Sequence, residues 1–196
     1  EIARQLQQAG AKVVMTGRNP DRLEEMCGEG FEAISADLSN AAGVDSLLAE
    51  WGERELDILI NNAGMLADHD FREGPIDPDV ADTCFYTNLS APVRLIAGLM
   101  DTLKSRPAAA IVNVTSGLAI SPAAGSPVYC ATKSGLRFYT LALREQLKGT
   151  GITVIEALPP VVDTQMNDGR NAKKMSPAEC ARQIIAAIAA DSNEAN

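Results

Sequence analysis

The stretch LDILINNAG (residues 56–64) is a short apolar run that ends in a turn-forming sequence. A second run of the same kind, AIVNV, spans residues 110–114. Short and nearly continuous apolar runs are typical of strands that are buried on both faces of a sheet. Such strands occur in parallel sheets that are covered by helices on both sides. The two runs therefore predict an α/β fold.

Strand-like and helical segments alternate along the whole chain. The strand-like runs are Lys12–Thr16, Phe31–Ser35, Leu56–Ile60, Ala110–Thr115 and Ile152–Leu158. The opening residues EIARQLQQAG are typical of a helix, and further helical periods span Pro20–Met26, Ala41–Trp51, Pro78–Lys104, Pro127–Lys148 and Pro177–Ala190. This alternation predicts a doubly wound, mostly parallel sheet of the Rossmann type in three α/β/α layers. We expect a single domain over residues 1–196.

The composition argues against several classes of protein. The chain of 196 residues has 17 Lys and Arg against 26 Asp and Glu, a formal net charge of −9, so we expect no nucleic-acid partner. No apolar run approaches the roughly 18 residues of a membrane span. The four cysteines form no CxxC pair and His69 is the only histidine, so we expect no metal site. Reduced, buried cysteines and a surface position for His69 fit a cytoplasmic protein.

Ligands of doubly wound sheets bind beyond the carboxyl ends of the strands, so the residues that follow each strand are informative. Gly17 and Arg18 follow the first strand-like run, with no acid that would hold the ribose of NAD. An arginine there suits the extra phosphate of NADP, although Arg18 as a solvated loop charge is the alternative. Asp37 follows the next run, and either contacts the adenine edge or caps the following helix.

Beyond the later strands lies a set of polar groups. The NNAG sequence of residues 61–64 lets the backbone approach a ligand and lets side-chain amides brace neighbouring strands. Ser116 comes at the end of the next strand, and Tyr129 and Lys133 follow on a helix. At spacing i, i+4 these two side chains share one helix face, and the ammonium lowers the pKa of the phenol. A phenol tuned in this way can give or take a proton. A buried aromatic beside an unrelated lysine is the alternative.

The ordered set NNAG, Asn88, Ser116, Tyr129 and Lys133 resembles the short-chain dehydrogenase/reductase family over essentially the whole chain. The sequences IVNVTSGLAISP, PVYCATKSGL and VIEALPPVVDT resemble its DltE-like oxidoreductase branch. The resemblance implies hydride transfer between a nicotinamide cofactor and a small carbonyl or alcohol, with Tyr129 as general acid or base. Lys133 would lower the pKa of Tyr129 and bind the nicotinamide ribose. Ser116 would orient the carbonyl oxygen, and Asn88 would hold a proton-relaying water.

The resemblance also implies a cofactor path and an assembly. NADP is the expected cofactor, with NAD as the alternative. The expected contacts are Arg18, Asp37, Leu38, Asn62, Ala63, Gly64, Tyr129, Lys133, Pro159, Val162 and Thr164. The family usually has Pro-Gly where this chain has Pro159-Pro160, and the second proline removes an N–H. The long helices imply a homodimer or homotetramer, and residues 164–177 lie where the family has a mobile substrate lid.

Two family elements have no counterpart in the sequence. The Gly-rich phosphate-binding turn and its strand are absent, and no last strand is expected after Ala190. The absent strand would lie between Lys12–Thr16 and Leu56–Ile60, where a gap would leave buried backbone groups unpaired. We therefore expect that residues preceded Glu1. Two other functions stay open: a non-catalytic binding or scaffold protein that retains the fold, and a related epimerase or dehydratase.

Overall fold

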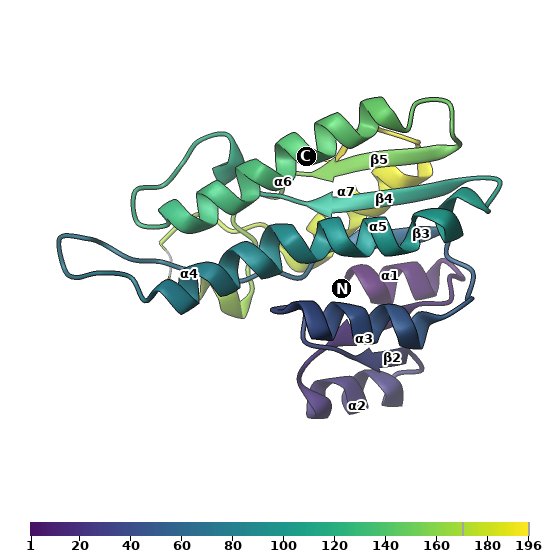
Figure 1. Ribbon diagram of the computed structural model, residues 1–196, viewed down its shortest axis with the longest axis horizontal. Helices are drawn as coiled ribbons and strands as arrows, with labels where there is room; N and C mark the ends of the chain where they lie inside the picture. Colours follow the sequence, from purple (N-terminus) through teal and green to yellow (C-terminus); the bar gives the residue numbers. More distant parts are fainter. Residues whose placement is uncertain (170, 196) are drawn as a thin grey trace.

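Strands and helices alternate along the chain, as the sequence predicts. The computed structural model describes residues 1–169 and 171–195 (Figure 1). The strands are β1 (Val14–Gly17), β2 (Glu32–Ser35), β3 (Ile58–Asn61), β4 (Ala109–Val114), β5 (Ile152–Ala157) and β6 (Glu194–Ala195). The helices are α1 (Ile2–Gln8), α2 (Pro20–Gly28), α3 (Ala41–Trp51), α4 (Pro78–Phe85), α5 (Ala91–Lys104), α6 (Pro127–Gln146) and α7 (Pro177–Ala189).

Within the described residues all strand pairs are parallel, and they form two sheets. β1 pairs with β2, and β3, β4, β5 and β6 form a second sheet in that order. β1 and β3, between which the sequence places an absent strand, are not paired with each other. In the four-stranded sheet Asn61 lies opposite Asn113, and Val114 lies opposite Ala157. Since this register aligns the carboxyl ends of β3, β4 and β5, the loops that follow them lie at one end of the molecule.

Alternating side chains of the central strands pack on two different helical layers. Ile111 of β4 and Val154 of β5 pack with α5 and α6, whereas their neighbours Val112 and Ile155 pack with α7. Figure 1 shows α5 and α6 in front of the four-stranded sheet and α7 behind it. A third apolar cluster joins α3 and β2 to α5. These clusters confirm the three-layer arrangement.

Proline and capping residues mark the helix starts. Pro20 and Pro177 occupy the first turns of α2 and α7, where a missing N–H leaves no helical bond unmade. The side chains of Asn19 and Ser176 accept hydrogen bonds from backbone N–H groups of the same first turns. The helix over Ala41–Trp51 has the bounds that the sequence predicts.

The expected single helix over residues 78–104 is wrong, because a π-helical turn at Tyr86–Ser90 divides it into α4 and α5. Pro92 explains the position of this turn. It has no N–H to donate to the carbonyl of Asn88 four residues earlier, so the α-helical bond cannot form there. The chain instead makes a wider turn, in which the Ala91 N–H reaches the carbonyl of Tyr86.

The expectation of no strand after Ala190 is also wrong. β6 pairs with β5 through Glu194 and Ala195. It is reached through a turn at Asp191, which adopts a φ of 47°. A two-residue strand in a polar tail carries no apolar pattern, so the sequence could not reveal it.

The cysteines are all free, and they differ in burial. Cys84 and Cys130 are buried, as expected, but Cys27 is exposed because it lies on the outer face of α2 near its end. Among the described residues, none of the helices combines the length and the apolar character that crossing a membrane requires.

Candidate active site

Helix α6 places Tyr129 and Lys133 one turn apart on the same face. Both side chains are buried, with relative exposures of 9% and 4%. The Lys133 Nζ atom lies 5.8 Å from the centre of the Tyr129 ring. The same atom donates a 2.8 Å hydrogen bond to the carbonyl of Val114, the last residue of β4. The lysine therefore connects the helix that carries the phenol with the end of a central strand.

Burial changes the proton affinity of Lys133. Loss of hydration lowers the pKa of its ammonium group from 10.5 to about 8, and nearby Cys84 opposes this shift. The side chain thus titrates close to neutral pH while remaining mostly charged there. A buried cation of this kind stabilises a negative charge that develops on a neighbouring group.

Ser116 follows β4 and begins a short 3₁₀ turn, Gly117–Ala119. Its hydroxyl oxygen accepts a 3.2 Å hydrogen bond from the backbone N–H of Leu118. The turn is attached to α6, because the Ser134 hydroxyl donates to the carbonyl of Ala119 at 3.0 Å. The serine therefore lies on a segment that α6 holds directly.

Asn88 occupies the π-helical turn and is fully buried. Its Oδ1 atom accepts from the N–H of Met65 at 2.8 Å, and its Nδ2 atom donates to the Met65 carbonyl at 2.9 Å. Nδ2 also lies 3.0 Å from the hydroxyl of Thr132, the neighbour of Lys133. Sequence reasoning missed Met65 and Thr132, which fix the amide between the loop after β3 and α6.

The NNAG turn lies against this group. A Cβ atom at Gly64 would come within 3.3 Å of Asn88 Oδ1 and 3.5 Å of Lys133 Nζ. Asn61 at the start of the turn donates to the side-chain oxygen of Asn113 on β4 at 2.8 Å. This contact confirms that an amide of the turn braces the neighbouring strand. Gly64, Asn88, Tyr129 and Lys133 are thus brought together, and Ser116 is held on the adjoining strand end.

The residues expected along the rest of the cofactor path lie in three places. Asn62 and Ala63 are exposed in the loop after β3. The Pro159 carbonyl accepts from the N–H of Gly117 at 3.3 Å, which places it beside the turn after Ser116. Val162 and Thr164 lie farther along the same loop, where Val162 forms an isolated parallel bridge with Met175.

Arg18 and Asp37 form a separate group at the carboxyl ends of β1 and β2. Their charged atoms lie 3.8 Å apart, and the Arg18 side chain is 72% exposed. Hydrogen bonds from Ser39, together with the charge of Arg18, lower the pKa of the Asp37 carboxyl group. Leu38 packs partly against the cluster formed by α3 and β2.

The idea that Asp37 caps the following helix is wrong. Asn40 is the N-cap of α3, and its side chain accepts from the N–H of Gly43 at 2.9 Å. Asp37 instead accepts from the Asn40 amide at 3.1 Å and so orients the cap. The two residues are three positions apart, and sequence alone does not distinguish which of two good capping residues begins the helix.

Known proteins resemble this chain over most of its length. The model of a family described as short chain dehydrogenase matches residues 1–175. An uncharacterized oxidoreductase, DltE, of Bacillus subtilis (strain 168) is 40% identical over 172 residues, which are 85% of this chain and 68% of the relative. An uncharacterized oxidoreductase of Staphylococcus aureus (strain N315) is 27% identical over 95% of this chain and 84% of its own length.

Solved structures share the fold. A short-chain dehydrogenase from Sphingobium yanoikuyae in complex with NADPH superposes with a TM-score of 0.90 at 25% identity, over 99% of this chain and 81% of the other. The closed form of a serine dehydrogenase complexed with NADP+ gives a TM-score of 0.85 at 27% identity, over 98% of this chain and 88% of the other.

Proposed function

Because the chain belongs to the short-chain dehydrogenase family of oxidoreductases, we propose that it transfers a hydride between a nicotinamide cofactor and a small carbonyl or alcohol substrate. The observation that carries the proposal is the buried pair of Tyr129 and Lys133, with Nζ 5.8 Å from the centre of the phenol ring. An ammonium group buried beside a phenol can assist proton transfer. In a protein that only binds a ligand, the free-energy cost of burying this charge would bring no such benefit.

The residues around the pair fit a nicotinamide nucleotide. The Lys133 ammonium has three N–H donors and gives one to Val114, so two others suit the hydroxyl groups of a ribose. Gly64 leaves the space beside Lys133 and Asn88 free of a side chain. Tyr129, Lys133 and Asn62–Gly64 would line the nicotinamide-ribose end of the path, and Pro159, Val162 and Thr164 would flank the nicotinamide. When bound, the nicotinamide supplies or accepts the hydride.

The protein's own residues would manage the proton. In the reducing direction the Tyr129 hydroxyl gives its proton to the carbonyl oxygen of the substrate, which becomes the alcohol. The Ser116 hydroxyl donates a hydrogen bond to the same oxygen and holds it in place. The Lys133 ammonium stabilises the tyrosinate that remains. Asn88 holds a water through which Tyr129 regains a proton from solvent.

We propose NADP rather than NAD as the preferred cofactor. The Arg18 guanidinium is exposed and lies at a loose 3.8 Å from Asp37, so it can turn toward a phosphate at little cost. Two of the similar structures are described in complex with NADPH or NADP+. Arg18→Ala should weaken NADPH binding by about tenfold and NADH binding by less than about twofold. Arg22→Ala removes another exposed arginine and is the control. Equal losses for both cofactors would contradict this preference.

We also propose that the protein is a homodimer or homotetramer. Phe85 of α4 and Phe138 of α6 are large apolar side chains with relative exposures of 41% and 71%. Covering them in an assembly would remove apolar surface from water. Light scattering at micromolar concentration should give a mass above that of one chain, and a purely monomeric mass would refute the proposal.

Turnover tests the main proposal. Purified protein should oxidise NADPH in the presence of at least one class in a panel of aldehydes and ketones. Binding of NADPH, measured by its fluorescence, is recorded in parallel. Binding without any turnover would favour a related reaction or a binding role, and neither binding nor turnover would refute the proposed function.

A further inference from the structure

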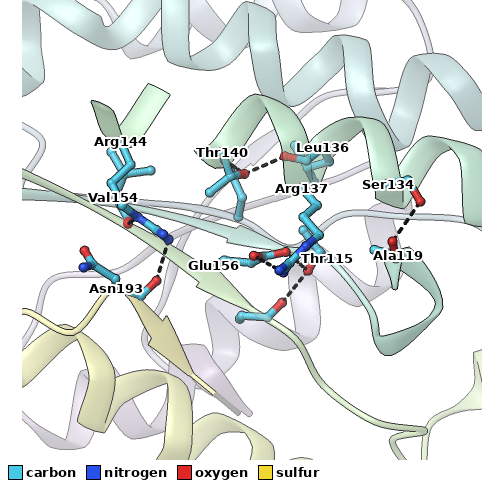
Figure 2. Close-up of polar contacts among 12 residues, drawn as sticks. Thr115, Ala119, Ser134, Leu136, Arg137, Thr140, Arg144, Val154, Glu156 and Asn193 are labelled. Atoms are coloured by element: carbon cyan, nitrogen blue, oxygen red, sulfur yellow. Dashed lines mark hydrogen bonds and ion pairs between the residues drawn. The ribbon is translucent and has the colours of Figure 1, made fainter. Parts of the chain in front are cut away.

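Glu156 of β5 is a fully buried carboxylate in a strand whose other buried residues are all apolar. A buried charge is tolerated only where partners satisfy it. Its Oε2 atom accepts a 2.5 Å hydrogen bond from the Arg137 guanidinium, and its Oε1 atom accepts a 2.8 Å bond from the Thr115 hydroxyl. Figure 2 shows Arg137 and Thr115 converging on Glu156. The carboxylate therefore joins three separate elements of the fold.

The two partners of Glu156 adjoin the candidate active site. Arg137 lies on α6 one turn after Lys133 and two turns after Tyr129, so the three residues share a helix face. Thr115 is 2% exposed and directly precedes Ser116. Its N–H donates to the Ala157 carbonyl at 2.8 Å, which fixes its backbone on β5. The chain of contacts thus runs from the helix of the phenol to the strand end of the serine.

Stability alone does not account for this arrangement. A buried ion pair often contributes no more to stability than apolar side chains of similar volume would. A buried pair with two defined hydrogen bonds does, however, select one alignment of the elements that it joins. Here the elements are α6 and the carboxyl end of β4, whose alignment decides the relative positions of the Tyr129 and Ser116 hydroxyl groups.

We propose that Arg137 and Glu156 are positioning residues, which act through Thr115 to hold the Ser116 hydroxyl in line with Tyr129 and Lys133. The inference rests on the proposed function, because it assigns a purpose to the alignment of these groups. In this proposal Arg137 and Glu156 act through Thr115 and not by contact with the substrate. Their removal should therefore affect the rate of the chemical step and leave cofactor binding nearly unchanged.

Arg137→Met tests the proposal, with Arg144→Met as the matched control. Arg144 lies on the same helix and also holds β5, through the carbonyl of Val154 at 2.9 Å, but it is more than four turns beyond Tyr129. Arg137→Met should lower kcat for NADPH-dependent carbonyl reduction by about 10- to 100-fold, because a small misplacement of reacting groups is costly. KM for NADPH should change by less than about twofold, and Arg144→Met should keep kcat within about twofold.

The double variant R137M/E156L separates positioning from stability. It removes the uncompensated buried charge, so its thermal stability should recover relative to Arg137→Met. The E156L substitution also removes the contact between Glu156 and Thr115, so kcat should stay low. Recovery of kcat together with stability would overturn the proposal, as would equal losses in Arg137→Met and Arg144→Met.

Thr115→Val covers the case in which Arg137→Met does not fold. The control is Thr153→Val, the same substitution near the first residue of β5. The Thr153 hydroxyl donates a hydrogen bond to the exposed Asp191 side chain, far from the carboxyl end of β5 that Thr115 contacts. Amide hydrogen exchange over residues 117–119 should be about tenfold faster in Thr115→Val and unchanged in Thr153→Val. This readout needs no turnover, so it tests the positioning even if no carbonyl is reduced. Equal exchange in the two variants would overturn it.

Discussion

Lys133 carries its charge in a buried site, which predicts an unusual dependence of stability on pH. The pKa of the folded-state ammonium is about 8, against an ordinary value of 10.5. Between these two values the unfolded chain binds more protons than the folded chain, so stability rises with pH. At about 1.36 kcal/mol per pH unit the full difference corresponds to roughly 3 kcal/mol. This increase in stability is absent below the pKa of the folded state and complete above the pKa of the unfolded state.

A variant isolates this contribution. Lys133→Met fills a similar volume without a titrating group. The free energy of unfolding of the wild type, relative to that of Lys133→Met, should increase by about 2 kcal/mol between about pH 7 and about pH 9.5. Other titrating groups are common to both proteins and largely cancel in the difference. Lys148→Met, which removes an exposed lysine beyond α6, is the control.

Urea denaturation followed by circular dichroism measures the three proteins at each pH. We expect the difference in unfolding free energy to rise with pH for Lys133→Met and to change by less than about 0.5 kcal/mol for Lys148→Met. A flat difference for Lys133→Met would refute the claim that burial controls this lysine. A falling difference would mean that the ammonium is stabilised by a partner rather than destabilised by burial.

Two further predictions concern close packing and buried polar contacts. Gly43→Ala should destabilise the fold by at least about 2 kcal/mol, because its Cβ would lie 1.9 Å from the backbone oxygen of Asp37. Gly28→Ala, whose Cβ meets nothing within 4 Å, should raise stability by up to about 1 kcal/mol, and urea denaturation of both variants checks the contrast. Asn113→Leu should cost about 2–4 kcal/mol, because the buried Asn61 amide loses its 2.8 Å acceptor and the Thr140 hydroxyl loses the N–H that donates to it at 2.9 Å. A loss below about 1 kcal/mol would show that the amide is dispensable.

The sequence predicts those parts of the site that depend on local periodicity. All six residues of β4 are buried, so an apolar run located this strand and therefore Ser116 at its end. Tyr129 and Lys133 lie one turn apart on one helix, as their i, i+4 spacing predicts. Residues only a few positions apart determine where a strand ends and which side chains share a helix face. The local sequence pattern therefore predicts both features.

Other parts depend on contacts between distant segments. Glu156 pairs with Arg137, 19 residues earlier and on another element. The strand sequence ITVIEA does not identify Arg137 as the partner. An acidic residue among buried apolar ones indicates only that a polar or charged partner exists. The π-helical turn at Asn88 has a local signal in the sequence, because Pro92, four residues later, has no N–H for the α-helical bond to the Asn88 carbonyl.

In the proposed reaction Tyr129 transfers the proton to or from the substrate oxygen. Tyr139 lies on the same helix, is partly buried and packs against the apolar core, so Tyr139→Phe is a matched control. The test is to measure kcat for NADPH-dependent carbonyl reduction, and the dissociation constant of NADPH, for both variants. Tyr129→Phe should lower kcat by at least about a hundredfold with NADPH binding within about twofold of wild type, whereas Tyr139→Phe should change neither. Equal kcat values for Tyr129→Phe and the wild type would contradict the account.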